Sequence, residues 1–434
     1  PLTIGFAIFA YHEKQKKEKR AWDSLDTLHE DDVFIPPAMT VANISSLRKL
    51  DPEFSQVLFE DFIYRLYAAA HQARSSDETL ARLAPYLSSR ARNYLKKRPP
   101  AGVPVSNVVI GSMKIIEVQV PDVKIAQDGT PNGVRVVIKF ESNLTAGPPN
   151  DPHTYYMRER WVLIRDATVQ TQAPDGVHSL HCPSCGAPYQ SSDQKRCDHC
   201  HQAVEGGHFD WSVSAISLLE QQRRPPSLTA NVIETGNDKA TVFQPGYERK
   251  FAKLTASDPE VTADALKARL ELIYTELNQA WTALDLRGAR PFVSDALCNY
   301  LQYWIDAYKN QGLKNVLENM RITKSEIVKT VRDRHFDAVT LRVYATGLDY
   351  TIRTSDNKRL SGSAKRNRAY TEYWTLIRAA KTRGAPRTDP NCPNCGAPLN
   401  IEMAGTCTYC NAHLTSGEFD WVLSRIEQDD SYNG

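Results

Sequence analysis

The sequence predicts an α+β protein built from two tandem copies of one module, each followed by a small four-cysteine zinc ribbon. Three observations predict this class: one long segment recurs in the second half of the chain, each copy changes from helical to alternating periodicity, and each ends in two C-x-x-C pairs. The chain has 434 residues, of which 41% are hydrophobic and 24% charged, so it can build more than one globular core.

The repeat is visible in three separate segments. DPEFSQVLFEDFIYRLYAAAHQA begins at Asp51 and its counterpart DPEVTADALKARLELIYTELNQA begins at Asp258. Further on, APYLSSRARNYL corresponds to RPFVSDALCNYL, and ERWVLIR corresponds to EYWTLIR, at almost the same separation. Because the number of residues between corresponding positions changes only slightly along the chain, we infer that one module is duplicated with small loop insertions.

Each module is expected to begin with helices. Apolar residues recur at the spacing of one helix face in the segments that start at Asp51 and Asp258. An aspartate before a proline suits an N-cap followed by proline at the first helical position, so we expect the helices to begin at these two residues. A second helical stretch follows in each copy, at residues 80–97 and 289–310.

Strands are expected after the helices of each module. Alternating apolar residues with many β-branched side chains are bounded by segments such as DGTPNG, PPND, TSDN and SGS. Helices followed by meandering antiparallel strands give an α+β layout. The expected strand segments are 108–120, 133–140 and 158–165 in the first copy, and 326–331, 336–345, 348–354 and 371–378 in the second.

The cysteines predict two metal sites. Eight of the nine cysteines form two sets with the spacing C-x2-C-x11-C-x2-C, in which two knuckles can close on one tetrahedral ion. Four thiolates leave no open position for water, so two structural Zn²⁺ ions in a reducing compartment are expected. The ninth cysteine, Cys298, suits a small buried hydrophobe. The predicted ligands are Cys182, Cys185, Cys197 and Cys200 in the first ribbon, and Cys392, Cys395, Cys407 and Cys410 in the second.

Two further features accompany the ribbons. Histidines crowd only the first one, at positions 181, 199, 201 and 208, where they could replace a ligand, bond to one, or lie in exposed loops. Each ribbon is followed by Phe-Asp-Trp, and Trp211 and Trp421 are expected to return the chain to its module and pack in the core.

The N-terminal segment has an apolar half and a basic half. PLTIGFAIFAY is shorter than the roughly 20 residues that span a bilayer, and HEKQKKEKR follows it. It fits the end of a membrane-spanning segment with cytoplasmic cations, which predicts a cytoplasmic (inner) membrane location with the soluble part in the cytoplasm. The alternatives are a chain that begins after a removed initiator methionine, and a short helix that docks on the protein's own core.

The expected organisation follows from these features. It comprises residues 1–11, the membrane-associated segment; 12–50, a basic juxtamembrane and helical linker; 51–180, the first module; 181–222, the first ribbon and its tail; 223–257, a linker; 258–386, the second module; and 387–434, the second ribbon and its tail.

The helix and Trp-strand motifs resemble a known family. DPEFSQVLFEDFIYRLYAAAHQA, PFVSDALCNYL and TEYWTLIR are similar to the C-terminal domain of the mitochondrial inner-membrane translocase subunit 44 (Tim44-like domains) and to bacterial relatives that add a CPxCGAPL ribbon. The resemblance covers about residues 51 to 430, in two copies. It implies a cone-shaped, nuclear-transport-factor-2-like fold with a curved antiparallel sheet. It also implies proteins that bind lipid and scaffold partners at membranes. No mitochondrial presequence or chaperone-recruiting region is recognised in these residues, so the import role is not expected to carry over.

The cone that the resemblance implies would enclose a cavity, and one apolar face of each long helix is the candidate lining. The alternative is ordinary core packing of an amphipathic helix. The candidate pocket residues are Phe59, Phe62, Ile63, Leu66, Tyr67, Leu266, Leu270, Ile273, Tyr274 and Leu277.

Three function classes follow from the sequence. The first is a non-enzymatic, membrane-tethered scaffold that engages membrane lipid or a protein partner. The second is an enzyme or a receptor for small hydrophobic ligands that uses a cavity. No nucleophile elbow, no phosphate-binding glycine loop and no H-E-x-x-H motif occurs, so neither catalysis nor a bound nucleotide is expected. The third is a nucleic-acid-associated ribbon protein, which a net charge of only +2 argues against.

Overall fold

The computed structural model divides the chain into two compact units that separate between Pro225 and Pro226. They are named here the N-terminal unit and the C-terminal unit, and each is described by itself. The structure describes residues 44–120, 133–148, 150–172, 181–183, 187, 189, 196–200, 202, 210–223, 228–229, 236–429, 431–432 and 434. The predicted membrane-associated segment at residues 1–11 lies outside them.

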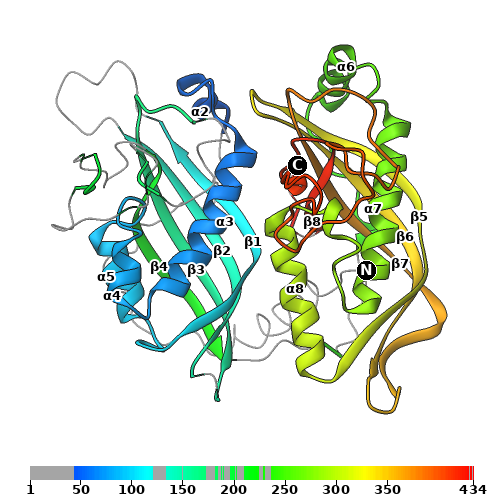
Figure 1. Cartoon of the computed structure of the whole chain (residues 1–434), viewed down its shortest axis with the longest axis horizontal. Helices are drawn as coiled ribbons and strands as arrows, with labels where there is room; N and C mark the ends of the chain where they lie inside the picture. The colour runs from blue at the N-terminus through cyan, green and yellow to red at the C-terminus, as the bar shows by residue number, and fades with distance from the viewer. Residues whose placement is uncertain are drawn as a thin grey trace. The chain divides into compact units, whose positions relative to one another are not determined.

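The N-terminal unit is an α+β structure with one four-stranded antiparallel sheet in the order β1-β2-β3-β4 (Figure 1). Four described helices precede the strands. In chain order, the elements are α2 (Ile44–Leu50), α3 (Gln56–Ala73), α4 (Asp77–Ala81), α5 (Ser89–Lys97), β1 (Val105–Gln119), β2 (Gly133–Ala146), β3 (His153–Asp166) and β4 (Ser212–Arg223).

The C-terminal unit repeats this layout with the strand order β5-β6-β7-β8. Its first three strands are longer than those of the N-terminal unit, its fourth is shorter, and β6 joins into one strand the two segments expected at 336–345 and 348–354. The elements are η2 (Gly236–Asp238), α6 (Tyr247–Ser257), α7 (Ala263–Ala283), η3 (Arg290–Phe292), α8 (Asp295–Asn310), β5 (Leu313–Arg332), β6 (Phe336–Arg353), β7 (Arg359–Ala379), η4 (Leu414–Ser416) and β8 (Val422–Gln428).

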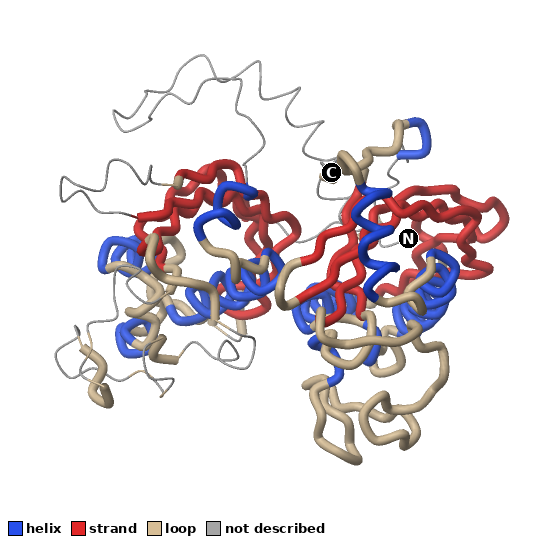
Figure 2. Tube along the Cα trace, turned by 90° about the horizontal axis from the view of Figure 1, so that it is seen from above, coloured by secondary structure: helices blue, strands red, loops and turns tan. Residues whose placement is uncertain are grey.

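In each unit the helices lie on one side of a curved sheet (Figure 2). The buried residues of β3 alternate along the strand, as expected for a sheet with one face in the core. In the N-terminal unit, Ile63 and Leu66 of α3 lie in the same core cluster as Ile138 of β2 and Trp161 of β3. The predicted α+β class with two antiparallel sheets is therefore confirmed.

The prediction that Asp51 and Asp258 cap the long helices is wrong. Helix α3 begins at Gln56, where the Ser55 hydroxyl accepts a hydrogen bond from the Leu58 amide at 3.3 Å. Helix α7 begins at Ala263, where Thr262 has the same role. Serine, threonine and aspartate are all good N-caps, so the residue type does not decide between these positions; the helices begin later because the two aspartates are held by other partners. The two aspartates are buried and have another role, described below.

Each ribbon is inserted between the third and fourth strands of its sheet. The segments after the ribbons, grouped with them in the sequence prediction, form β4 and β8, which pair with β3 and β7. The segment at 223–257, predicted as a linker, also contains helix α6, which the weak periodicity did not indicate. Within the described residues, no helix is long and apolar enough to cross a membrane.

Candidate metal centres and buried polar clusters

The second ribbon brings its four cysteines together. The sulfur atoms of Cys392, Cys395, Cys407 and Cys410 all lie within 4.8 Å of one another. The Sγ atoms of Cys392 and Cys410 are 3.9 Å apart, and those of Cys395 and Cys407 are 4.0 Å apart. Zinc–sulfur bonds of about 2.3 Å in a tetrahedron place the sulfurs about 3.8 Å apart, so the four thiols fit a zinc ion without rearrangement.

Two tight turns hold these sulfurs in place. The Cys392 amide donates to the Ala397 carbonyl at 2.7 Å, and the Cys407 amide donates to the Ala412 carbonyl at 2.9 Å. The residue after the second cysteine of each pair has a left-handed backbone, with φ of 74° at Gly396 and 57° at Asn411. Glycine and asparagine tolerate this conformation best, which explains their place after each C-x-x-C pair.

The thiols of the second ribbon differ in acidity. The Asn394 amide donates to the Cys410 sulfur at 3.4 Å and, as the largest cause, lowers the pKa of Cys410 to about 6. The pKa of Cys395 rises to about 11: a hydrogen bond from the Ala397 backbone lowers it, but burial and the neighbouring thiols raise it by more. A bound cation would offset the repulsion between neighbouring thiolates, because it stabilises all four negative charges at once.

The first ribbon places three of its predicted ligands together. The sulfurs of Cys182, Cys197 and Cys200 lie within 4.8 Å of one another, and Cys182 and Cys200 are 3.8 Å apart. The fourth predicted ligand, Cys185, lies outside the described residues, as do His201 and His208. His199 is exposed and His181 is half-buried; neither belongs to the group of candidate ligands formed by the described residues.

Both clusters therefore suit a metal ion held by thiolates. Thiolate coordination favours Zn²⁺ among the common divalent ions, and the four ligands of the second ribbon leave no position for a substrate. The chemistry that zinc would supply here is cross-linking: it joins two turns that are a dozen residues apart into one rigid subdomain.

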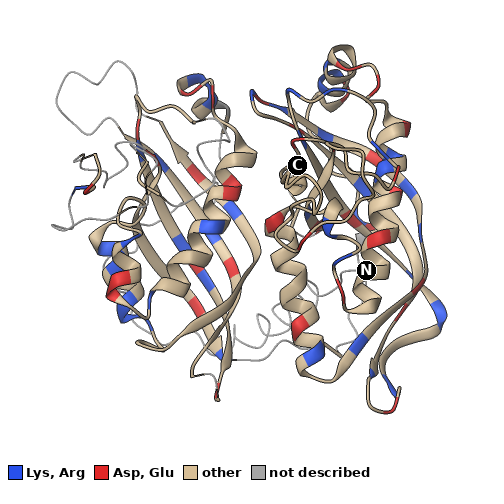
Figure 3. Cartoon of the chain, viewed as in Figure 1, with Lys and Arg blue, Asp and Glu red and all other residues tan. Residues whose placement is uncertain are grey.

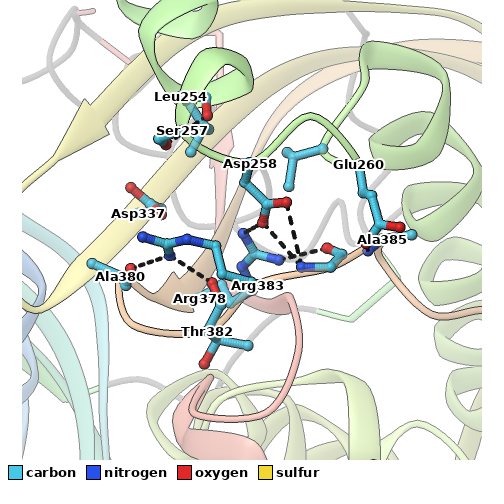
Figure 4. A network of polar contacts seen from close by, with 12 residues as sticks. Leu254, Ser257, Asp258, Glu260, Asp337, Arg378, Ala380, Thr382, Arg383 and Ala385 are labelled. Carbon is cyan, nitrogen blue, oxygen red and sulfur yellow. Dashed lines mark hydrogen bonds and ion pairs between the residues drawn. The ribbon is translucent and has the colours of Figure 1, made fainter.

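A buried aspartate, arginine and tryptophan tie each ribbon to its unit. In the C-terminal unit, Asp258 accepts a hydrogen bond from Nη2 of Arg378 at 2.7 Å, and both side chains are at most 4% exposed. The Arg378 guanidinium lies 4.8 Å from the ring centre of Trp421, the tryptophan of the Phe-Asp-Trp segment. The carboxylate also accepts from the Gly384 amide at 3.1 Å, and Figure 4 shows Asp258 and Arg378 within this network of polar contacts. We call this arrangement the Asp–Arg–Trp brace.

The N-terminal unit contains the same brace at equivalent positions. Asp51 pairs with Arg165 at 2.7 Å, and the Arg165 guanidinium lies 4.6 Å from the ring centre of Trp211. The sequence analysis missed the two arginines and misassigned the two aspartates. The sequence did contain an indication of this pairing, since the aspartate, the arginine and the tryptophan of the brace all recur in both copies. Buried charges are costly unless they are paired, so recurrence of both charges indicates a structural pair.

The ten candidate pocket residues all lie in the cores of the two units. Their exposed fractions do not exceed 5%, and the five from α3 belong to one core cluster that includes Phe140 and Trp161. Tyr67 and Tyr274 make polar contacts there: Tyr67 bonds to Ser142 at 2.7 Å, and Tyr274 bonds to Tyr370 at 2.6 Å.

Next to this face, the N-terminal unit buries a charged cluster. Glu159 accepts hydrogen bonds from His71 at 3.0 Å and from the indole of Trp161 at 3.1 Å, and its other oxygen forms an ion pair with Arg98 at 3.1 Å. Burial alone would raise the pKa of Glu159, but the contacts with His71, Arg98 and Trp161 outweigh it and hold this pKa at about 2. Burial lowers the pKa of His71, so the imidazole is neutral and the carboxylate is ionised.

The equivalent carboxyl group in the C-terminal unit has neutral hydrogen-bond partners. Glu372 accepts from the indole of Trp374 at 2.9 Å and from the Gln428 amide at 2.8 Å. Burial raises its pKa, because these two neutral donors stabilise the anion less than a guanidinium does. The two copies thus keep the carboxyl group and the tryptophan but differ in the charge that surrounds them.

One protein family matches a segment of this chain. Residues 248–387, which run from α6 through β7, match the Tim44-like domain family. No curated protein matches the chain. One similar solved structure is described as an Ntf2-like protein involved in plasmid conjugation; it is 8% identical, the match covers 85% of this chain and 96% of that chain, and the TM-score is 0.19. The C-terminal unit therefore carries a Tim44-like domain over residues 248–387.

Proposed function

We propose that this protein is a non-enzymatic scaffold that uses two Tim44-like modules to engage an anionic membrane surface. The family match covers the second module. The first module is proposed to be of the same kind because it has the same strand order, the same brace and an equivalent ribbon position. In this proposal the zinc sites are structural, since the four cysteines of the second cluster can complete its coordination alone and three cysteines come together in the first.

The observation that carries the membrane part is an exposed basic hairpin between β6 and β7. Lys358, Arg359, Lys365 and Arg366 are all exposed there and take part in no ion pair among the described residues. Figure 3 shows how the Lys and Arg residues, in blue, are distributed over the elements of the chain. The other two cations of the hairpin are paired, Arg353 with Asp356 at 2.9 Å and Arg368 with Asp349 at 3.0 Å. Unpaired cations on one protruding hairpin suit the negative surface of an anionic bilayer.

The location proposed for the protein rests on the N-terminal sequence. The apolar segment at residues 1–11, followed by a basic one, would place the chain at the cytoplasmic membrane with both modules in the cytoplasm. In that arrangement the hairpin adds an electrostatic contact to the apolar one, and two such contacts bind more stably than either alone.

Vesicle co-sedimentation of the full chain tests the proposal. Phosphatidylcholine vesicles with and without phosphatidylglycerol would be compared at low and high salt. Each cation near an anionic surface contributes about 1 kcal/mol, so replacing the four unpaired hairpin cations with glutamine should weaken binding up to about a thousandfold. A control with the same charge change replaces four exposed cations elsewhere, namely Arg90, Lys97, Arg249 and Lys253. Equal binding by both variants, or no binding by the unmodified chain, would contradict the proposal.

A second candidate function is favoured by one observation, the facing titratable pair His71 and Glu159. A receptor or an enzyme that used this pair would need a ligand to reach it, and both side chains are fully enclosed. The full chain should then bind a small ligand in the N-terminal unit.

A further inference from the structure

The interiors of the two modules differ at three equivalent positions around a shared carboxyl group. Where the N-terminal unit has His71, Arg74 and Arg98, the C-terminal unit has Asn278, Trp281 and Trp304. The duplicated chain therefore provides its own comparison: one module has a histidine and two arginines at these positions, and the other has an asparagine and two tryptophans. Neutral side chains suffice to build this fold, so the two arginines need a different explanation.

Arg98 has several partners, although its Nε atom has none among the described residues. Its guanidinium pairs with Glu159 at 3.1 Å, donates to the Gln221 amide oxygen at 3.2 Å, and also contacts the hydroxyl of Tyr94. The buried carboxylate of Glu159 therefore already has a cationic partner.

Arg74 is the second cation, and no carboxylate pairs with it among the described residues. It is 3% exposed, and its Nε and Nη1 atoms lack a hydrogen-bond partner among those residues. Its Nη2 reaches only the Pro100 carbonyl, at 3.5 Å, which is the outer limit for a hydrogen bond. Burial, with the nearby charge of Arg98, lowers the pKa of Arg74 to about 10. The guanidinium stays charged at neutral pH while its donors are mostly unused.

The replacement for Arg74 in the second module has its partner. The Trp281 indole donates to Asn315 at 2.9 Å, and the side chain is fully buried. That position can thus be filled by a satisfied neutral group. Leaving a buried donor without an acceptor costs about 1–3 kcal/mol, and more for a charged group, so the retained arginine points to an acceptor that the described residues do not supply.

We propose that Arg74, next to Arg98, binds an oxyanion in the interior of the N-terminal unit. Arg74 interacts electrostatically with both Arg98 and Glu159, so two guanidinium groups lie in the field of one carboxylate. The unused N–H groups of Arg74 are suited to carboxylate or phosphate oxygens. The tyrosine and tryptophan rings around His71, with Tyr67 at 4.6 Å and Trp161 at 6.2 Å, add apolar surface beside the charge. The site goes beyond the membrane-surface function, because it lies inside the other unit.

Hydrogen exchange on the full chain tests the site with three defined anions. Acetate, octanoate and inorganic phosphate would each be titrated at constant ionic strength, and exchange would be followed in peptides from α3 and β3. An anion that binds only the folded unit slows exchange about tenfold when its concentration is ten times the Kd. A larger effect of octanoate than of acetate assigns a carboxylate with an apolar tail, and a larger effect of phosphate assigns a phosphate ester.

Arg74→Met is the decisive variant. The direction in which it changes the hydrogen-exchange rate separates a ligand-binding role of Arg74 from a structural one. If the arginine serves a ligand, the variant loses the anion response. In anion-free buffer it then exchanges no faster than the unmodified chain, because an unpartnered buried cation has been removed. Arg90→Met, at an exposed arginine, should keep the full response. Arg74→Lys, which keeps the charge, should retain part of it.

The proposal is overturned in two ways. If none of the three anions slows exchange in the unmodified chain, no oxyanion site exists. If Arg74→Met accelerates exchange equally with and without anions, Arg74 has a structural role instead. Failure of the vesicle test leaves both outcomes unaffected, so the two proposals can be judged separately.

Discussion

Replacing one buried glutamate in each module with glutamine should change the stability of the two units in opposite directions. Glu159 and Glu372 occupy equivalent strand positions and both bond to an indole two residues away. Glu159 is ionised against Arg98, whereas Glu372 has two neutral hydrogen-bond partners. Glu159→Gln should therefore destabilise the N-terminal unit, and Glu372→Gln should stabilise the C-terminal unit at neutral pH.

The size of the first effect follows from the charge environment. The pKa of Glu159 falls from 4.5 to about 2, so the folded unit favours the ionised form. Removing one partner of a buried ion pair costs about 3–5 kcal/mol, and Glu159→Gln removes the carboxylate that pairs with Arg98. A depressed folded-state pKa means that this stability is present above about pH 4.5 and is lost as the pH falls toward 2.

The second effect has the opposite sign. Burial raises the pKa of Glu372, so the folded unit favours the neutral form, and stability is lost as the pH rises through the folded-state pKa. Glutamine mimics the neutral form at every pH. Its carbonyl can accept from Trp374, and Gln428 can turn its own amide so that its carbonyl accepts from the new amide.

Unit-resolved hydrogen exchange measures both effects in the same sample, with β3 reporting on one unit and β7 on the other. At neutral pH, Glu159→Gln should accelerate exchange through unfolding of the N-terminal unit by about two orders of magnitude, and leave β7 unchanged. Glu372→Gln should slow exchange in β7. If both substitutions accelerate exchange to the same extent, the opposite charge environments inferred here are wrong.

Two further predictions concern the brace and the metal. Asp258→Asn should cost the C-terminal unit about 3–5 kcal/mol because Arg378 is left unpaired, whereas Asp389→Asn, in an exposed pair, should cost at most about 1 kcal/mol; urea unfolding checks both, and equal costs would refute the brace. Cys395→Ser should lower the zinc content from two ions per chain to one and destabilise the C-terminal unit, whereas Cys298→Ala should keep both ions; metal analysis and hydrogen exchange measure this, and an unchanged zinc content would contradict the four-thiolate assignment.

The parts of the fold that the sequence predicted are those in which one periodicity dominates. Alternation in RERWVLIR and TEYWTLIR located β3 and β7, and the apolar face at Ile63 and Leu66 located α3. Cysteine spacing located the metal clusters because only a fixed turn geometry brings four sulfurs together. Helix α6 was not predicted, since an isolated face of weak periodicity carries little signal without the sheet on which it packs.

The cap and the brace show why local rules were insufficient. Asp51 and Asp258 each precede a proline, and the capping rule is satisfied by sequence alone at these positions. The partners that decide their role, Arg165 and Arg378, lie more than a hundred residues away in the chain. A capping rule contains no information about such a partner. A comparison of the two copies does, because it shows that the aspartate and the arginine recur together.

The same comparison separates what builds the module from what it does. The brace, the indole–carboxyl contact and the position of the ribbon are kept in both copies, so each belongs to the fold that two diverging copies must still adopt. Arg74 and Arg98 occur in one copy only, and Trp281 and Trp304 show that the fold does not need them. A duplicated module can lose a charged interior without unfolding. Retention of an unsatisfied buried cation in one copy is therefore better explained by a bound anion than by packing.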